Sequence, residues 1–145
     1  MVFGRRPRLL IVDDDADLQS ILKVLAELEG YEVLQALDGA SAFSLACDAQ
    51  PDVVLIDICM PLVDGRELLS TLKAHPGTAQ IPVLMCSARH ELADRAHSLE
   101  LGAADYLDKP FDFRSLLSKI TGVLERFRLN RESDVSQKPL AQSGC

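Results

Sequence analysis

Short apolar runs alternate with longer amphipathic segments along most of the chain. Uninterrupted apolar runs are typical of strands buried on both faces of a sheet, whereas apolar residues spaced three and four apart indicate amphipathic helices. The predicted strands span 9–12, 31–34, 53–56, 81–86 and 105–108. The predicted helices span 18–30, 41–49, 65–74, 92–101 and 113–127. The pattern therefore repeats one strand-helix unit five times.

This alternation predicts an α/β fold, a doubly wound five-stranded parallel sheet with five helices of the flavodoxin-like type. Short strand-helix units need right-handed crossovers, which place helices on both faces of the sheet. In such sheets the ligand binds outside the carboxyl ends of the strands, where the strand order reverses. We expect one domain at 8–127, an N-terminal extension at 1–7 and a polar, flexible tail at 128–145.

Composition narrows the choice of partners. The chain of 145 residues has 15 Lys and Arg against 22 Asp and Glu, a net charge of −7. This acidity argues against a phosphate backbone as partner, so no direct nucleic-acid binding is expected. No apolar run is long enough for a signal-peptide core or a membrane span, so we expect a cytoplasmic location and no membrane partner. The four cysteines show no C-x-x-C spacing, which gives little support for a zinc site.

Acidic residues follow two of the predicted strands directly. Asp13, Asp14 and Asp15 come after the first strand, and Asp57 ends the third. Adjacent acids at a strand end are unfavourable unless they cap a helix or share a cation. Two or three such carboxylates brought together form an oxygen site suited to Mg²⁺. The alternative is that Asp14 or Asp15 caps the next helix and Asp57 caps a loop.

A hydroxyl and an ammonium group reach the same edge of the predicted sheet. Ser87 closes the fourth strand, and Lys109 follows the fifth. Each has an ordinary alternative, since a serine after a strand often begins a turn and a lysine there often faces solvent. Lys109 precedes Pro110, however, and a Lys-Pro bond at a strand end favours a fixed turn that can be cis and can hold the ammonium inward.

Taken together, four segments closely resemble the receiver domains of bacterial two-component response regulators, in the single-domain, chemotaxis-regulator-like form. The resemblance runs from Arg8 to Phe127. The segments are Leu-Ile-Val-Asp13-Asp14-Asp15, Val-Leu-Ile-Asp57-Ile-Cys-Met-Pro61 with Asp64-Gly65, Pro-Val-Leu-Met-Cys-Ser87-Ala, and Gly-Ala-Ala-Asp-Tyr106-Leu-Asp-Lys109-Pro110-Phe. The resemblance implies a phosphorylation-activated signalling switch rather than an enzyme, one that assists its own phosphotransfer and slow autodephosphorylation.

The same resemblance assigns a metal site and an acceptor. It implies that Asp57 accepts a phosphoryl group from a sensor histidine kinase or a histidine phosphotransfer protein. Mg²⁺ would be the cofactor, held by Asp13, Asp14, Asp57 and the backbone carbonyl of Cys59.

Three further roles follow from the resemblance. Ser87 would bond the phosphoryl group, Lys109 would balance its charge, and Tyr106 would be the aromatic switch residue. The helix at 92–101, the strand at 105–108 and the helix at 113–127 would form the face that an output protein, not identified by the sequence, reads. The alternative for Tyr106 is a partly buried aromatic residue with no switching role.

Two rival functions remain to be weighed. Asp13-x-Asp15 after a buried strand also resembles the nucleophile and acid of haloacid dehalogenase-type hydrolases, with a serine and a lysine as later motifs. Those enzymes carry Thr or Val two residues after the second acid, where this chain has Asp17, and they would leave Asp57 unexplained. The second rival is a pseudo-receiver, an interaction module that keeps the fold without phosphorylation. The complete set of site residues counts against it.

Overall fold

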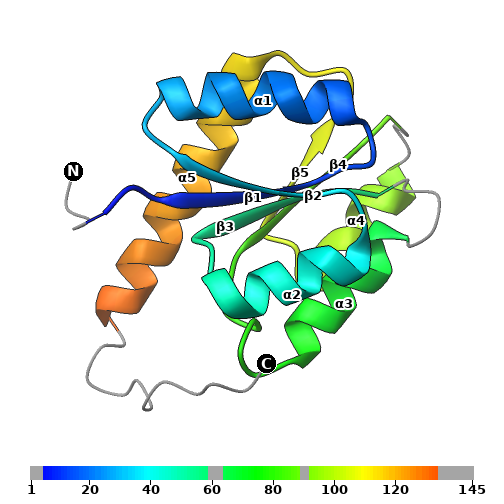
Figure 1. The fold of residues 1–145 in the computed structure, drawn as a ribbon. Coiled ribbons are helices and arrows are strands. Elements are labelled where there is room, and N and C mark those ends of the chain that lie inside the picture. The colour runs from blue at the N-terminus through cyan, green and yellow to red at the C-terminus, as the bar shows by residue number, and fades with distance from the viewer. Residues whose placement is uncertain (1–4, 59–63, 89–91, 134–145) are drawn as a thin grey trace.

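Strands and helices alternate along the whole described chain, as the apolar pattern predicts (Figure 1). The computed structural model describes residues 5–58, 64–88 and 92–133. The strands are β1 (Arg8–Val12), β2 (Glu32–Ala36), β3 (Val53–Asp57), β4 (Val83–Ser87) and β5 (Asp105–Asp108). The helices are α1 (Ala16–Leu28), α2 (Gly39–Ala49), α3 (Gly65–Ala74), α4 (Leu92–Glu100) and α5 (Phe113–Ser133).

The five strands form one parallel sheet in the order β2-β1-β3-β4-β5. The chain runs outward from β1 to β2 and then returns to the other side of β1, so the order reverses between β1 and β3. Figure 1 shows α1 and α5 on one face of the sheet and α2, α3 and α4 on the other. The predicted doubly wound, flavodoxin-like fold is confirmed, and its switch point is the β1/β3 boundary.

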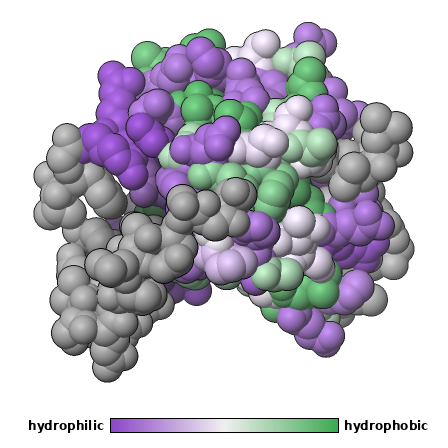
Figure 2. Space-filling view, turned by 60° about the horizontal axis from the view of Figure 1, so that its bottom comes forward, coloured by the Kyte–Doolittle hydropathy of each residue, from purple (hydrophilic) through white to green (hydrophobic). Residues whose placement is uncertain are grey.

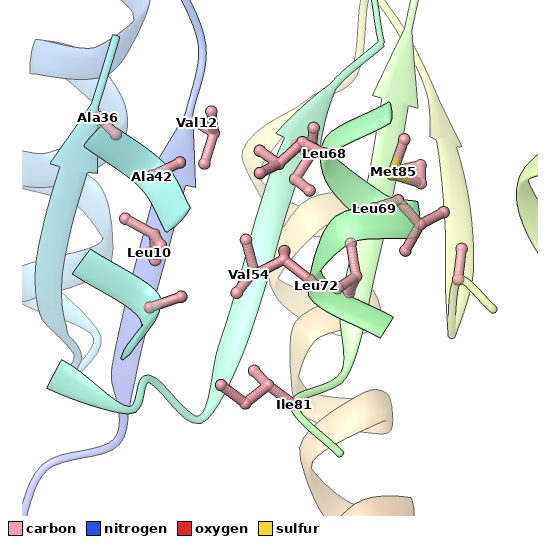
Figure 3. Close-up of a cluster of buried hydrophobic side chains, with 14 of the residues drawn as sticks. Leu10, Val12, Ala36, Ala42, Val54, Leu68, Leu69, Leu72, Ile81 and Met85 are labelled. Atoms are coloured by element: carbon pink, nitrogen blue, oxygen red, sulfur yellow. The ribbon is translucent and has the colours of Figure 1, made fainter. Parts of the chain in front are cut away.

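The core has two layers because successive strand side chains point to opposite faces of the sheet. One layer packs the even-numbered positions of β1 and β3 against α2 and α3, as Figure 3 shows for Leu10, Val54 and Leu72. The other packs Leu9 and Ile11 against the inner sides of α1 and α5. Both faces of the central strands are therefore buried, and this accounts for the uninterrupted apolar runs in the sequence.

Aspartates cap the helices that follow several of the strands. Asp15, Asp38 and Asp64 are the N-cap residues of α1, α2 and α3. In each, a side-chain oxygen accepts a hydrogen bond from a backbone N–H two or three residues later, at 2.8 to 3.0 Å. Such caps satisfy donors that the first turn of a helix leaves open.

Many of the predicted boundaries differ from the structure by one or two residues, and the end of the last helix differs by six. β2 begins one residue after Tyr31, because the Tyr31 N–H donates to the carbonyl of Ala26 and so closes the end of α1. The last helix runs to Ser133 rather than 127, since residues 128–133 contain no glycine or proline to end it. Residues 134–145 of the predicted tail lie outside the described residues.

The outer surface is mixed. Figure 2 shows hydrophilic residues over much of one face with apolar residues between them. On α1, three large apolar side chains are exposed, Ile21, Val24 and Leu28. Within the described residues, no helix combines the length and the apolar character that crossing a membrane requires.

Candidate functional site

The acids that follow β1 and β3 meet at the carboxyl edge of the sheet. The two strands are neighbours, with Val12 opposite Ile56, so the residues that come next, Asp13 and Asp57, lie side by side. Both are buried, whereas Asp14 is exposed. Carboxylate oxygens of Asp13, Asp14 and Asp57 all lie within 4.8 Å of one another. The structure thus brings together the three acids that the sequence placed in one cluster.

Asp15 has a different role from the three acids of the cluster. Its side chain caps α1 by accepting a hydrogen bond from the Leu18 N–H at 3.0 Å, and its own N–H donates to Asp13 Oδ1 at 2.9 Å. The capping alternative therefore holds for Asp15, and Asp14 is not the residue that caps α1. A dehalogenase-type site would need Asp13 and Asp15 to act together, whereas here Asp57 is the partner of Asp13.

Lys109 reaches the cluster from the end of β5. Its Nζ lies 2.9 Å from Asp13 Oδ2 and 3.6 Å from Asp57 Oδ2. Burial lowers the pKa of the Lys109 ammonium, but the hydrogen bond to Asp13 and the nearby negative charges outweigh this, so its pKa lies above the ordinary value. The Lys109–Pro110 peptide bond is cis, and the ammonium faces inward, as the sequence suggested.

The donor set fits a divalent cation. Among the described residues, the carboxylates of Asp13, Asp14 and Asp57 gather beside the ammonium of Lys109. Hard carboxylate oxygens are the ligands that Mg²⁺ prefers, and a bound cation would relieve the repulsion between the buried acids. Cys59, expected to add a backbone carbonyl, lies outside the described residues.

The end of β4 borders the cluster. Cys86 pairs with Asp57 across the sheet, so Ser87 stands one residue further toward the site edge, where it is fully buried. The backbone carbonyl of Ser87 accepts a hydrogen bond from the Lys109 N–H at 2.7 Å. Burial raises the pKa of the Cys86 thiol to about 12, so this free thiol stays protonated and unreactive behind the site.

Tyr106 lies on the inner side of β5 and is buried in the core layer beneath α3 and α4. The guanidinium carbon of Arg95, on α4, lies 5.2 Å from the centroid of its ring. Arg95 also forms an ion pair with Asp108 at 2.8 Å. The predicted switch residue therefore points inward and is covered by a cation from the neighbouring helix.

Gly65 supports the site in a way that the sequence did not reveal. A Cβ atom at this position would meet the backbone carbonyl oxygen of Asp57 at 2.4 Å. The Gly65 N–H donates to the carbonyl of Ile58 at 2.9 Å. The start of α3 thus rests directly against the end of β3, and only glycine leaves room for that approach. The available signal was the Asp64-Gly65 pair.

The comparison with known families agrees with this geometry. The model of the response regulator receiver domain matches residues 9–121. The chain belongs to the response regulator receiver family. The receiver is 46% identical over 119 residues to the transcriptional regulatory protein CpxR of Escherichia coli K12, covering 82% of this chain and 50% of CpxR. The chain therefore contains a receiver domain of the kind found in two-component systems.

Two further proteins are similar to this receiver. The DNA-binding dual master transcriptional regulator RpaA of Synechocystis is 39% identical over 120 residues, which cover 83% of this chain and 50% of RpaA. The structure of the chemotaxis response regulator CheY4 of Vibrio cholerae superposes with a TM-score of 0.77 at 28% identity, covering 81% of this chain and 98% of that one. The chain spans about half the length of the curated relatives it matches.

These relatives correct one expectation. The acidity of the chain led us to expect no direct nucleic-acid partner, but RpaA is described as DNA-binding and CpxR as a transcriptional regulator. The expectation is wrong because net charge was judged on a segment that corresponds to half of such a regulator. An acidic receiver is compatible with DNA binding elsewhere in the same protein.

Proposed function

We propose that this receiver is a switch turned on when Asp57 accepts a phosphoryl group from a histidine kinase or a histidine phosphotransfer protein. The observation that carries the proposal is the meeting of Asp13, Asp14 and Asp57 with Lys109 at the carboxyl edge of the sheet. In this proposal, Mg²⁺ is held by the three acids and the backbone carbonyl of Cys59. A cytoplasmic location stays a prediction of the sequence.

The chemistry needs little covalent help from the protein. A carboxylate oxygen of Asp57 attacks the phosphorus of the phosphohistidine, the P–N bond breaks with its electron pair going to the imidazole, and an acyl phosphate forms. Such transfers depend on positioning and on neutralising charge at the equatorial oxygens. Lys109 supplies one positive charge and bound Mg²⁺ would supply the rest. Slow hydrolysis of the acyl phosphate by water would reset the switch.

The signal would leave the site through Ser87 and Tyr106. The Ser87 hydroxyl bonds the phosphoryl oxygens, and its movement changes the packing around Tyr106. The inward position of Tyr106 under Arg95 supports this role, since α4 and β5 are joined at this residue. A partner then reads the altered surface of α4, β5 and α5. Charge reversal on this surface that left partner binding unchanged would count against the assignment.

The phosphodonor would dock on α1. This helix begins directly after the acidic loop, and its outer side exposes Ile21, Val24 and Leu28, with relative exposures of 57%, 58% and 77%. Their spacing of three and four residues makes one apolar stripe, of the kind that packs against a helix of a partner. A donor helix on this stripe would lie beside the site.

For the whole protein, we propose that the output function is DNA binding. CpxR and RpaA are 46% and 39% identical to this chain, against 28% for CheY4. A single-domain, chemotaxis-like form stays a prediction of the sequence. Blotting the protein from its native cells with an antibody to the receiver measures its length, and a mobility shift with promoter DNA tests the output. A native protein of the length of this chain that leaves promoter DNA unshifted would contradict the DNA output.

The central test is the intact mass of the protein after incubation with Mg²⁺ and a small phosphodonor. We expect the gain of one phosphoryl group that requires Mg²⁺ and is absent from Asp57→Asn. If neither a small donor nor a phosphorylated histidine phosphotransfer protein labels the native chain, the pseudo-receiver is the better description. Release of phosphate from unrelated phosphoesters that depends on Asp15 would instead favour the hydrolase.

A further inference from the structure

One buried side chain beside the acidic loop has no place in the mechanism above. Gln19 lies on α1 with a relative exposure of 3%. Its Nε2 lies 3.1 Å from the carbonyl oxygen of Ile11, 3.1 Å from that of Asp13 and 2.8 Å from that of Ala36. A buried amide in contact with three backbone carbonyls is unusual on the inner face of a helix, which is normally apolar.

The three carbonyls share one location, the point where β1 and β2 stop pairing. The N–H of Asp13 also donates to the carbonyl of Ala36, at 3.2 Å. Beyond this point the strands separate, and carbonyls left without a donor in the interior would carry a desolvation cost. The amide of Gln19 supplies that donor and ties the start of the acidic loop to both strands.

A second amide fixes the orientation of the first. The Nε2 of Gln35, on β2, donates to Gln19 Oε1 at 3.0 Å and to the Gln19 backbone carbonyl at 2.7 Å. The oxygen of the Gln19 amide therefore faces a donor while its nitrogen faces acceptors. A flipped Gln19 amide would set its oxygen against three carbonyl oxygens. The hydrogen bonds of Gln19 and Gln35 are therefore satisfied in only one orientation of the Gln19 amide.

We propose that Gln19, locked by Gln35, is a positioning residue that holds Asp13 in the geometry needed to bind a divalent cation. The inference rests on the proposed function of the same site. It follows from the direct bond between the Gln19 amide and the Asp13 backbone, one residue before Asp14 in the cluster. Mg²⁺ tolerates little departure from octahedral geometry, so the backbone position of Asp13 decides how well its carboxylate can serve.

The test is calorimetric titration of Mg²⁺ into the native protein, Gln19→Met and Gln35→Met. Groups that orient metal ligands typically contribute about 10–100-fold to metal affinity. We expect Gln19→Met to weaken Mg²⁺ binding by about tenfold, and Gln35→Met to weaken it by less, because the Gln19 donor remains. At saturating Mg²⁺, phosphorylation of Asp57 by a small donor should return close to the native rate in both variants, since Gln19 does not contact the reacting atoms.

Ile120→Val is the matched control for general destabilisation, since Ile120 is buried on α5 in the same core layer as Leu22 of α1. It should leave the affinity for Mg²⁺ unchanged. Native affinity in Gln19→Met, or an equal loss in Ile120→Val, would overturn the positioning role. If Gln19→Met does not fold, Gln35→Met decides, and native affinity there overturns the role. Absence of Mg²⁺ binding in the native protein would instead refute the proposed function.

Discussion

The two ends of β3 carry two aspartates with the same burial and opposite surroundings. Asp52, before the first residue of the strand, and Asp57, its last residue, are each 6% exposed. The carboxylate of Asp52 accepts hydrogen bonds from the Arg8 N–H at 2.7 Å and from the Arg5 guanidinium at 3.0 Å. Asp57 instead shares its surroundings with two further acids and Lys109.

This difference distinguishes a carboxylate that is buried to stabilise the fold from one that is buried in a candidate binding site. At the amino edge of the sheet the chain supplies its own positive charge, so Asp52 ties the N-terminal segment to β3. At the carboxyl edge three carboxylates lie within 4.8 Å of one another, so the folded state holds an electrostatic repulsion that a bound cation can reduce. One buried carboxylate is thus a poor sign of a binding site, whereas several carboxylates brought within 4.8 Å of one another are a better one.

The largest expected effect is the response of the carboxyl edge to Mg²⁺. At about 100 times its dissociation constant, a ligand specific to the folded state raises the free energy of unfolding by about 2.7 kcal/mol. We expect this increase in the native protein and little of it in Asp57→Asn, measured by urea unfolding with and without Mg²⁺. Equal stabilisation of the native protein and Asp57→Asn by Mg²⁺ would show that the cation binds away from Asp57.

Next in size, alteration of the two ends of β3 should change stability in opposite directions. Asp52→Ala removes an acceptor of three hydrogen bonds, two of them from Arg5. It should lower the free energy of unfolding by about 2 kcal/mol, a figure reduced because the Arg5 side chain is half exposed and screened by solvent. Asp57→Asn in the absence of divalent cations relieves repulsion and should raise it by about 1 kcal/mol. Urea unfolding of both variants gives the sign of each change in the free energy of unfolding. A loss of stability in both variants would contradict the contrast between the two ends of β3.

Glycine substitution offers a smaller, more local test. Gly65→Ala would push α3 against the carbonyl of Asp57 and should cost about 1–2 kcal/mol while slowing phosphorylation. Gly122→Ala on α5 is the control, since a Cβ there meets nothing within 4 Å, and alanine in a helix should instead stabilise. Thermal unfolding and the phosphorylation rate are the measurements. Equal behaviour of the two variants would show that Asp57 tolerates the shift.

The smallest expected effect is a pH dependence at the amino edge. Burial raises the pKa of Tyr31 above its ordinary value of 10.0, against the lowering effect of a hydrogen bond with Thr121. At a pH slightly above 10, the folded state therefore keeps the Tyr31 proton while the unfolded chain has lost it. The contribution of Tyr31 to the free energy of unfolding is fully present below pH 10 and is lost as the pH rises through the folded-state pKa. Urea unfolding between pH 9 and pH 11 should show the fall in the native protein and less of it in Tyr31→Phe.

Sequence reasoning reached the fold and the acidic cluster because both depend on short-range patterns. Apolar runs that end in acids locate the strand ends, and a parallel sheet brings those ends together. The local pattern could not assign Asp13, Asp14 and Asp15 separately, since the path of one loop decides which carboxylate caps α1, and only the resemblance to receivers singled out Asp13 and Asp14. It missed Gln19, although a polar residue three positions before Leu22 on an apolar stripe was a signal, because the meaning of that residue depends on where β1 and β2 separate.

The contact between Lys109 and Asp13 joins residues that are 96 positions apart in the chain. A ribosome that has synthesised the chain as far as Asp108 has made Asp13 and Asp57 but not the lysine that contacts them. A chain truncated before Lys109 therefore lacks the ammonium of this site. Because the site is completed only when β5 pairs with β4, a chain arrested before that step would not offer the arrangement proposed above for phosphorylation.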